Sequence, residues 1–391
     1  MTESGGGLAR LRPVSTSSMP GALATALHGG APIAPLPPPG AELDLIADAL
    51  GLDAPVTEPD VAAVVATSGS TGQPKAVVLS RAAITAAVAA THARLGGPGD
   101  WVLALPTHHV AGLMVVARAV LGGTRVHPLP SDLTGLAETE SRMSGRRYLA
   151  LVPTQLWRAC RQPVLATALA DFDAVLLGGA AADPQLLAEA RRHSITVVTT
   201  YGMSETCGGC VYDGVPLQGV EVDIEPRSGQ IVLGGSMLFS GYRLRPDLSR
   251  AAVRAGRLVT ADRGEWRSGR LHVLGRTDDV VISGGSNVDL AEIERAARTW
   301  PGLAGSEVAV LGVPDREWGT KVVVVTEADA PPAGLRSYLA ERLPPHAVPR
   351  EVTSMAALPR TTSGKIDRRR LARLAAPTPD RINPDNGKEP G

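Results

Sequence analysis

A loop rich in hydroxyl groups and glycine ends in a lysine between two apolar, strand-like stretches. It reads Thr67-Ser68-Gly69-Ser70-Thr71-Gly72-Gln73-Pro74-Lys75, with VAAVVAT before it and AVVLS after it. Backbone N–H groups and hydroxyls in such a loop can bind phosphate oxygens, and the lysine adds a point charge. The loop is not a Walker A motif, which places four residues between its glycines and opens a helix. The alternative interpretation is a Gly/Ser turn with a surface lysine.

Lysine is scarce in this chain of 391 residues. The 39 basic residues include four lysines (Lys75, Lys321, Lys365 and Lys388) and therefore 39 − 4 = 35 arginines. A compact ammonium differs physically from a planar guanidinium, so some positions accept only lysine. We therefore expect the surviving lysines to include functional ones, and two of them lie in Gly/Ser/Thr loops.

Further segments carry groups suited to a nucleotide. Tyr201-Gly-Met-Ser-Glu-Thr206 follows a strand-like stretch, where ligands bind in open α/β sheets. Its aromatic ring can stack on a base, and its carboxylate can bind a hard cation such as Mg²⁺. Thr260-Ala-Asp262 and Gly275-Arg276-Thr-Asp278-Asp279 offer charges for ribose and phosphate, and 359–367 place Lys365 in a second loop. Taken singly, each segment is also compatible with a capped turn or a solvated charge pair.

Alternating strand-like and helix-like stretches would position these loops. The expected strands are 61–67, 76–80, 101–106, 174–179 and 195–202, and the expected helices include 81–95 and 112–123. This alternation favours a largely parallel sheet with crossover helices. Short strands at Gly-marked turns are expected over 215–275, followed by a helix at 289–299, strands at 306–313 and 320–326, and a helix at 333–342. The Pro-rich stretch 32–40 is expected to resist regular structure, and the tail after 375 to be disordered.

Composition excludes several classes of protein. The 39 acidic residues balance the 39 basic ones, and without a basic block the chain is not a dedicated binder of nucleic acid or anionic membranes. No apolar run reaches the roughly 18–20 residues that span a bilayer. Three cysteines in 391 residues cannot form a disulfide framework, which favours a reducing, cytoplasmic location.

Two short motifs could bind metal, and we disfavour both. Cys207-Gly-Gly-Cys210 could be a redox pair or half of a zinc site, but no second cysteine pair accompanies it. His108-His109 has no companion ligands at metal spacing in the sequence.

Together and in this order, TSGSTGQPK, GGA, YGMSE, TAD, GRTDD and PRTTSGKI resemble the motifs of the acyl-adenylate-forming enzymes. This family includes acyl-CoA synthetases, aryl-CoA ligases, luciferases and peptide-synthetase adenylation domains, and the resemblance runs from about residue 60 to 372. It implies an α/β fold with a large N-terminal domain of parallel-type sheets with helices plus a distorted β-barrel subdomain, and a small mobile α+β C-terminal domain. The expected divisions are a truncated Pro/Gly-rich segment 1–60, an adenylation domain 61–277, a mobile domain 278–375 and a tail 376–391.

The resemblance also assigns roles to matching residues. Lys75, Glu205 and Lys365 would be catalytic, Glu205 and Thr71 would bind Mg²⁺, and Asp278 would be the hinge of the C-terminal domain. The residues implied to bind ATP or CoA are Thr67, Ser68, Gly69, Ser70, Thr71, Gly72, Gly178, Gly179, Ala180, Tyr201, Asp262, Arg276, Ser283, Gly284 and Gly285. Ser204 stands where the family usually has threonine, and Ala261 where it usually has glycine.

These residue types suit the expected reaction. A carboxylate oxygen attacks the α-phosphorus of ATP while pyrophosphate leaves in line, so the transition state is anionic and needs positive charge. Lys75 and Mg²⁺ would serve the leaving pyrophosphate, and Lys365 the attacking carboxylate and the α-phosphate. Rotation about Asp278 would then withdraw Lys365 and let a thiol reach the acyl-adenylate.

The acid is indicated by a narrower resemblance. LPTHHVAGL with Arg118 nine residues after His109, LVPTQLWR, YGMSETCGG and GRTDDVVISGGSNV are similar to the o-succinylbenzoate–CoA ligases of menaquinone synthesis. The implied substrates are an aromatic keto-dicarboxylic acid, ATP and CoA, with His109, Arg118 and Ser204 contacting the acid. The alternatives are Arg118 on a solvent-exposed helix face, another aryl- or acyl-CoA ligase, a stand-alone adenylation enzyme, or a non-catalytic binder. The oligomeric state stays open, a homodimer included.

Overall fold

The computed structural model describes residues 9–67, 74–303, 306–361 and 366–375. The described residues divide into two compact units, one that ends at Leu274 and one that begins at Gly275. The predictions for Ser68, Gly69, Ser70, Thr71, Gly72, Lys365 and the tail 376–391 lie outside the described residues.

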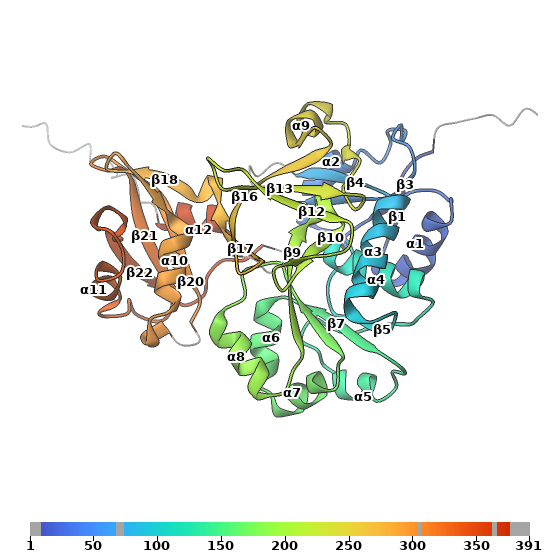
Figure 1. Cartoon of the computed structure of the whole chain (residues 1–391), viewed down its shortest axis with the longest axis horizontal. Coiled ribbons are helices and arrows are strands. Elements are labelled where there is room, and N and C mark those ends of the chain that lie inside the picture. Colours follow the sequence, from blue (N-terminus) through green and yellow to red (C-terminus); the bar gives the residue numbers. More distant parts are fainter. Residues whose placement is uncertain (1–8, 68–73, 304–305, 362–365, 376–391) are drawn as a thin grey trace, which may run out of the picture. The chain divides into compact units, whose positions relative to one another are not determined.

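A five-stranded sheet begins the larger unit (Figure 1). Its order is β1-β2-β3-β4-β14, where the strands are β1 (Arg12–Val14), β2 (Ile33–Pro35), β3 (Val61–Thr67), β4 (Lys75–Ser80) and β14 (Gly241–Tyr242). β1, β2 and β3 are parallel, whereas β4 is antiparallel to both β3 and β14.

The N-terminal residues are more regular than the sequence suggests. The segment before residue 60 forms β1, α1 (Met19–Leu27), β2 and α2 (Ala41–Leu50), so the expectation that 32–40 would resist regular structure is wrong for the strand Ile33–Pro35. Ile33 and Ala34 are fully buried, and burial between two neighbouring strands outweighs the local effect of the prolines. Pro35 lies at the end of its strand, where the missing N–H matters least.

A seven-stranded sheet forms the centre of the larger unit. Its order is β11-β10-β9-β8-β7-β5-β6, with β5 (Asp100–Leu103), β6 (Val126–Pro128), β7 (Arg147–Leu151), β8 (Ala174–Leu177), β9 (Val197–Met203), β10 (Gly208–Tyr212) and β11 (Val215–Pro216). The run from β9 to β6 is parallel, which confirms the predicted parallel sheet, and β10 and β11 continue it in antiparallel pairing.

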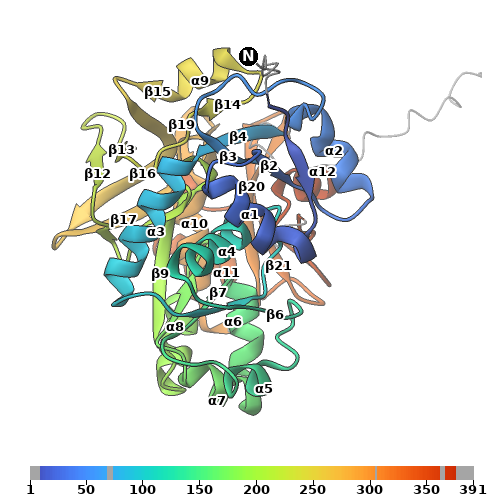
Figure 2. The same ribbon diagram turned by 90° about the vertical axis from the view of Figure 1, so that its right-hand side faces the viewer.

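Helices cover both faces of these sheets. One core cluster contains α1, α3 (Arg81–Leu95) and α4 (Val110–Gly122) together with residues of both sheets, and Figure 2 shows the three helices grouped. On β5, Trp101 and Leu103 belong to this cluster. Val102 and Ala104 point the other way, into a cluster with α5 (Leu136–Glu140), α6 (Pro153–Cys160), α7 (Pro163–Ala170) and α8 (Pro184–Arg192). Because both faces are buried there, β8 is a continuous apolar run, AVLL.

A buried arginine fastens the N-terminal segment to the first sheet. Arg243, which is 2% exposed, follows β14 directly. Its guanidinium donates hydrogen bonds to the carbonyl oxygens of Leu50 (2.7 Å), Gly51 (2.9 Å) and Ala54 (2.6 Å). Its backbone N–H donates to the carbonyl oxygen of Ala76 in β4 at 2.8 Å. One side chain therefore joins the end of α2 to the strands around it.

A third sheet completes the larger unit. Most of its strands are short, as the sequence predicts, but the strand Arg257–Arg267 has 11 residues. β12 (Val220–Ile224), β13 (Gln230–Gly235), β16 (Arg257–Arg267) and β15 (Val253–Arg254) follow one another in antiparallel pairs, β17 (Arg270–Arg276) pairs with β16, and α9 (Pro246–Ala252) precedes β15.

The smaller unit is an α+β structure. Its elements are the hairpin of β18 (Val280–Ser283) and β19 (Ser286–Asp289), the sheet β20-β21-β22 (Val308–Asp315, Gly319–Glu327 and Glu351–Met355), and the helices α10 (Leu290–Arg298), α11 (Leu335–Ala340) and α12 (Arg368–Ala375). The predicted helices and strands at 289–342 agree with these bounds to within a few residues. Among the residues described in both units, no helix is long and apolar enough to cross a membrane.

Candidate active site

Several predicted site residues follow the carboxyl ends of the parallel strands in the larger unit. His108 and His109 come after β5, Gly178 comes directly after β8, and Tyr201 lies in the last half of β9. The carboxyl ends of parallel strands lie at one edge of a sheet, which is where open α/β folds bind ligands. The larger unit therefore gathers these residues at one edge.

Lys75, Tyr242 and Glu205 form a cluster at the start of β4. The Nζ atom of Lys75 lies 5.1 Å from the centroid of the Tyr242 ring, and the Tyr242 hydroxyl donates a 2.7 Å hydrogen bond to Oε1 of Glu205. Thr67 and Lys75 are opposite each other in the β3–β4 ladder, so both ends of the predicted phosphate loop are fixed. Burial, and the Glu205 carboxylate beside it, raise the pKa of Tyr242, which keeps the hydroxyl protonated and able to donate. Tyr242 could not be identified from the sequence, where it stands only as the last residue of an SGY turn.

Tyr201 and Asp262 form a second pair in the same unit. The Tyr201 hydroxyl donates to Oδ2 of Asp262 at 2.9 Å, and burial together with this carboxylate raises the pKa of Tyr201. The backbone N–H of Asp262 donates to Oγ1 of Thr260 at 3.0 Å, while that hydroxyl donates to the carbonyl oxygen of Ile231 at 2.8 Å. The residues predicted to hold the adenine and the ribose are thus joined by a direct hydrogen bond.

The turn that carries Ser204 and Glu205 is fixed by Thr206. Residues Ser204–Thr206 form one turn of 3₁₀ helix, and the fully buried Thr206 hydroxyl accepts from the N–H of Met203 at 2.9 Å and lies 2.6 Å from the carbonyl oxygen of Gly208. The carbonyl oxygen of Glu205 accepts from the N–H of Phe239 at 2.9 Å. Ser204 is half-buried on this turn, next to the clustered Glu205.

Gly178, Gly179 and Ala180 leave β8 as a backbone segment. The N–H of Gly178 donates to the carbonyl oxygen of Leu151 at 3.1 Å, and a Cβ atom at Gly178 would lie 2.5 Å from Oγ1 of Thr200. Gly179 has a φ of +84°, which favours glycine. Gly179 and Ala180 are exposed, so their backbone groups are open to a ligand.

Arg118 is buried inside the larger unit. It is 4% exposed, so the alternative of a solvent-exposed helix face is wrong. Its Cζ atom lies 5.1 Å from the Trp101 ring centroid, and Nη2 lies 3.5 Å from the Tyr212 hydroxyl. Within the described part of the chain, Arg118 forms no ion pair and its Nε has no hydrogen-bond partner. Helix α4 buries Arg118 because its neighbours are small and apolar and both of its sides face the core.

The two histidines meet a carboxylate that the sequence reasoning missed. Nε2 of His108 lies 3.5 Å from Oε1 of Glu42, and Nε2 of His109 lies 3.9 Å from the same oxygen. Glu42 is in the first turn of α2, far from the histidines in sequence, so no spacing rule could have found it. The statement that the histidine pair lacks a companion ligand holds for the sequence but is wrong for the fold.

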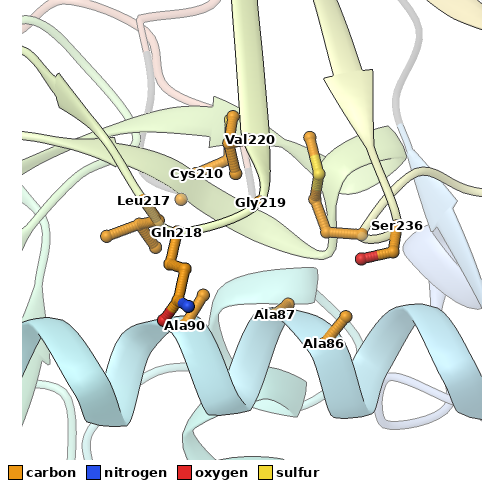
Figure 3. A pocket seen from close by; sticks show the side chains of 11 residues that line it. Ala86, Ala87, Ala90, Cys210, Leu217, Gln218, Gly219, Val220 and Ser236 are labelled. Atoms are coloured by element: carbon orange, nitrogen blue, oxygen red, sulfur yellow. The ribbon is translucent and has the colours of Figure 1, made fainter.

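The cysteine pair is part of the core. Cys207 and Cys210 are both free thiols and are 0% and 1% exposed. Burial raises the pKa of each to about 12, which makes the thiolate needed for redox or metal chemistry scarce at neutral pH. Cys210 lines a small cavity whose opposite wall is Ala86, Ala87 and Ala90 of α3 (Figure 3). The side chains of Cys207 and Cys210 therefore pack in the core of the larger unit. The structure gives no support to their interpretation as a redox pair.

The smaller unit holds the remaining predicted residues. Arg276 and Asp278 form a bidentate ion pair with N–O distances of 2.8 and 2.9 Å. Burial would raise the pKa of Asp278, but hydrogen bonds from Arg276 outweigh this effect and lower it. Gly284 and Gly285 form the two-residue turn of the β18–β19 hairpin, and both have positive φ, as a type I′ turn requires. Ser283 is the last residue of β18, directly before this turn.

Arg368, which follows the predicted catalytic lysine closely in sequence, belongs to an ion-pair network. Arg368, three residues after Lys365, donates to Oε2 of Glu294 at 2.6 Å and to the carbonyl oxygen of Val310 at 2.9 Å. Arg298 binds the other oxygen of the same carboxylate at 3.0 Å. Burial would raise the pKa of Glu294, but the two guanidinium groups together lower it. The sequence reasoning missed this network, which anchors the start of α12 to α10 and β20.

Two family models match the chain. The model described as AMP-binding enzyme matches residues 21–243, and the model described as AMP-binding enzyme C-terminal domain matches residues 292–365. The first match alone covers more than half of the chain and contains the clusters around Lys75 and His109.

Named relatives and solved structures are similar as well. The chain is 44% identical over 332 residues to the probable 2-succinylbenzoate–CoA ligase of Mycobacterium tuberculosis, a match that covers 81% of this chain and 85% of that protein. It is 28% identical to the 2-succinylbenzoate–CoA ligase of Staphylococcus aureus, over 80% of this chain and 67% of that one. The o-succinylbenzoate CoA synthetase of Bacillus subtilis, solved with its acyl-adenylate intermediate, has a TM-score of 0.72 at 25% identity, covering 90% of this chain and 80% of that chain.

Proposed function

The chain belongs to the AMP-binding enzyme family, and from this premise we propose that it is an AMP-forming 2-succinylbenzoate–CoA ligase. It uses ATP to activate 2-succinylbenzoate as an acyl-adenylate and transfers the acyl group to CoA, in the synthesis of menaquinone. The main support within the structure is the grouping of Lys75, Tyr242 and Glu205 in the same unit as the Tyr201–Asp262 pair. The identity of the acid is supported by the 44% identical relative.

The first half-reaction needs positive charge around an anionic transition state. A carboxylate oxygen of the acid forms a bond to the α-phosphorus, and the bond from that phosphorus to the bridging oxygen of pyrophosphate breaks. We assign Lys75 and the loop 67–72 to the β- and γ-phosphates, Asp262 to the ribose and Lys365 to the reacting oxygens. Tyr201 and the segment 178–180 bind the adenine.

The residues around Glu205 fit a magnesium ion. A carboxylate is the ligand type that Mg²⁺ prefers, and the hydrogen bond from Tyr242 fixes the orientation of this one. When bound, the ion would neutralise charge on the departing pyrophosphate, and Thr71 is the second residue that we assign to it. Tyr242 thus orients Glu205 through this hydrogen bond.

The second half-reaction transfers the acyl group. The sulfur of CoA forms a bond to the acyl carbon, the carbon–oxygen bond to AMP breaks, and AMP leaves with the electron pair. We assign Ser283, Gly284 and Gly285 to the passage for the CoA arm, and Asp278 to the hinge that exchanges the two active conformations. The bidentate pair with Arg276 would have to break or turn with that hinge.

Arg118 is the residue that we assign to the second carboxylate of the acid. A buried cation without a carboxylate partner among the described residues is costly unless an anion binds it. Arg118→Leu should raise KM for 2-succinylbenzoate far more than KM for ATP, because only the acid has the carboxylate. Equal changes in the two constants would contradict this role. Since Leu fills the site without charge, the melting temperature should not fall, which separates recognition from folding. We assign His109 and Ser204 to the rest of the acid.

A pyrophosphate-release assay tests the whole proposal. The chain is supplied with ATP, Mg²⁺ and a panel of acids, with and without CoA. We expect release that depends on 2-succinylbenzoate and a thioester product that appears only with CoA. Turnover with another aryl or acyl acid alone would contradict the assigned substrate, and no release with any acid would contradict the assigned reaction.

Two further properties follow as hypotheses. ATP and CoA are both available in the cytoplasm, and the three free cysteines suit a reducing compartment, so we place the ligase there. A homodimer is the oligomeric state to test first, by sedimentation equilibrium of the purified chain.

A further inference from the structure

Two imidazoles and a carboxylate converge in the larger unit, and none of the three is a residue that we assign to ATP. His108 and His109 end the loop after β5, and Glu42 reaches them from the first turn of α2. Their ligand atoms all lie within 4.8 Å of one another. The three side chains are supplied by two segments that only the fold brings together.

The distances between these atoms suit a single metal ion. In a tetrahedral zinc site with bonds of about 2.0–2.2 Å, neighbouring ligand atoms are roughly 3.3–3.6 Å apart. Nε2 of His108 is 3.5 Å from Oε1 of Glu42, and Nε2 of His109 is 3.9 Å from it. Small side-chain rotations would bring both nitrogens to bonding distance of one ion.

His108 provides a second, independent observation that points to a ligand at this cluster. The residue is only 8% exposed, and its Nε2 has no hydrogen-bond partner although it faces Glu42. The 3.5 Å separation is longer than an ordinary N–H···O hydrogen bond. A buried polar atom without a partner costs free energy, which a bound ion would recover.

We propose that Glu42, His108 and His109 form a binding site for a transition-metal ion of the zinc class, distinct from the magnesium site at Glu205. Imidazole ligands suit zinc, cobalt and nickel, whereas Mg²⁺ prefers oxygen ligands. Three protein ligands leave a fourth position open to water or to a ligand oxygen.

The site has a consequence for catalysis that rests on the proposed function. A bound metal ion would be coordinated by Nε2 of His109, so this imidazole, which we assign to the acid pocket, could no longer contact the acid through that atom. Zinc should therefore raise KM for the acid in the wild-type enzyme and leave KM in the Glu42→Gln variant unchanged.

Direct metal binding tests the site without any turnover, so its outcome is separate from that of the ligase assay. The untagged full-length chain is freed of metal with a chelator and titrated with Co²⁺, whose visible absorption is strong in four-coordinate sites and weak in hydrated ions. We expect stoichiometric uptake with strong visible bands, displaced by Zn²⁺, and loss of that uptake in His108→Gln and Glu42→Gln.

His193 and Glu189 offer a matched control. Nε2 of His193 lies 3.8 Å from Oε1 of Glu189 on α8, a similar pair without a third ligand among the described residues. His193→Gln should leave Co²⁺ uptake unchanged. Equal uptake by the wild type and His108→Gln, or only hydrated-type spectra, would overturn the proposal.

A second substitution at position 108 shows whether loss of metal uptake in His108→Gln results from misfolding. His108→Cys keeps a metal ligand at this position, so uptake should persist with an added sulfur-to-cobalt charge-transfer band. Absence of that band in a folded His108→Cys variant would also count against the site.

Discussion

Removing one oxygen atom from Tyr242 should weaken the use of MgATP. Tyr242→Phe keeps the ring that lies 5.1 Å from Lys75 and its 5.0 Å edge contact with Phe239, but it removes the 2.7 Å hydrogen bond to Glu205. The variant therefore isolates the orientation of the Glu205 carboxylate from the packing around it.

The expected size follows from the type of bond. A hydrogen bond to a charged group contributes about 1.5–3 kcal/mol. Since about 1.4 kcal/mol corresponds to a factor of ten in rate, complete loss of this orientation would lower kcat/KM for MgATP by roughly 10- to 150-fold. Part of the loss should be recovered at high Mg²⁺ concentration, because the metal can then reorient the carboxylate.

The measurement is ATP–pyrophosphate exchange at saturating acid, over a series of MgATP and free Mg²⁺ concentrations. Tyr148→Phe is the matched control, since its fully buried hydroxyl lies 3.0 Å from the carbonyl oxygens of Leu95 and Gly97, near the amino end of β7. The control should lower the melting temperature and leave MgATP kinetics unchanged. A Tyr242→Phe enzyme with kcat/KM within a factor of two of wild type would refute the orienting role.

Three other predictions concern different groups. Tyr201→Phe removes the 2.9 Å hydrogen bond to Asp262 and should raise KM for ATP by about 10-fold or more, with the acid's KM unchanged in initial-rate kinetics. Because the folded pKa of Glu294 is lowered, its stabilisation is present above an unfolded pKa of about 4.3 and is lost as pH falls through the folded value. The difference in urea midpoint between wild type and Glu294→Gln should therefore shrink below about pH 4, and a constant difference would contradict the linkage. Lys365→Ala and Lys365→Arg should both abolish adenylate formation yet make thioester from supplied acyl-adenylate; normal pyrophosphate exchange would exclude the assigned role.

Local patterns predicted the parts of the fold that rest on local properties. The apolar runs at β3 and β8 and the helix Arg81–Leu95 could be predicted directly, because strands buried on both faces consist largely of apolar residues. The structure of the Pro-rich segment could not be predicted in this way, because the strand Ile33–Pro35 forms through burial between the neighbouring strands β1 and β3.

The candidate site likewise contains residues that local sequence motifs identify and residues that only the tertiary structure identifies. Lys75, Glu205 and Asp262 lie in contiguous motifs and could be named from the sequence. Tyr242 and Glu42 could not be named, because each acts through a partner that only the tertiary structure brings near. Arg118 shows the limit most clearly, since one apolar helix pattern allowed both an exposed and a buried position, and the fold buries it.

Because the hydrogen bonds of Arg243 join residues 50–54 to β4, we expect this segment and the first sheet to open and close together. If residues 50–54 detached, a fully desolvated guanidinium would lose three carbonyl partners at once, and the neighbouring Tyr242 would lose its fixed backbone. Amides near Leu50 should therefore exchange their hydrogens as slowly as those of β4, although one lies at the end of a short helix and the other inside a sheet. Substitutions in the segment 50–54 would then affect the proposed MgATP site at Glu205 through the loss of cooperative opening, without any change in the residues that we assign to ATP.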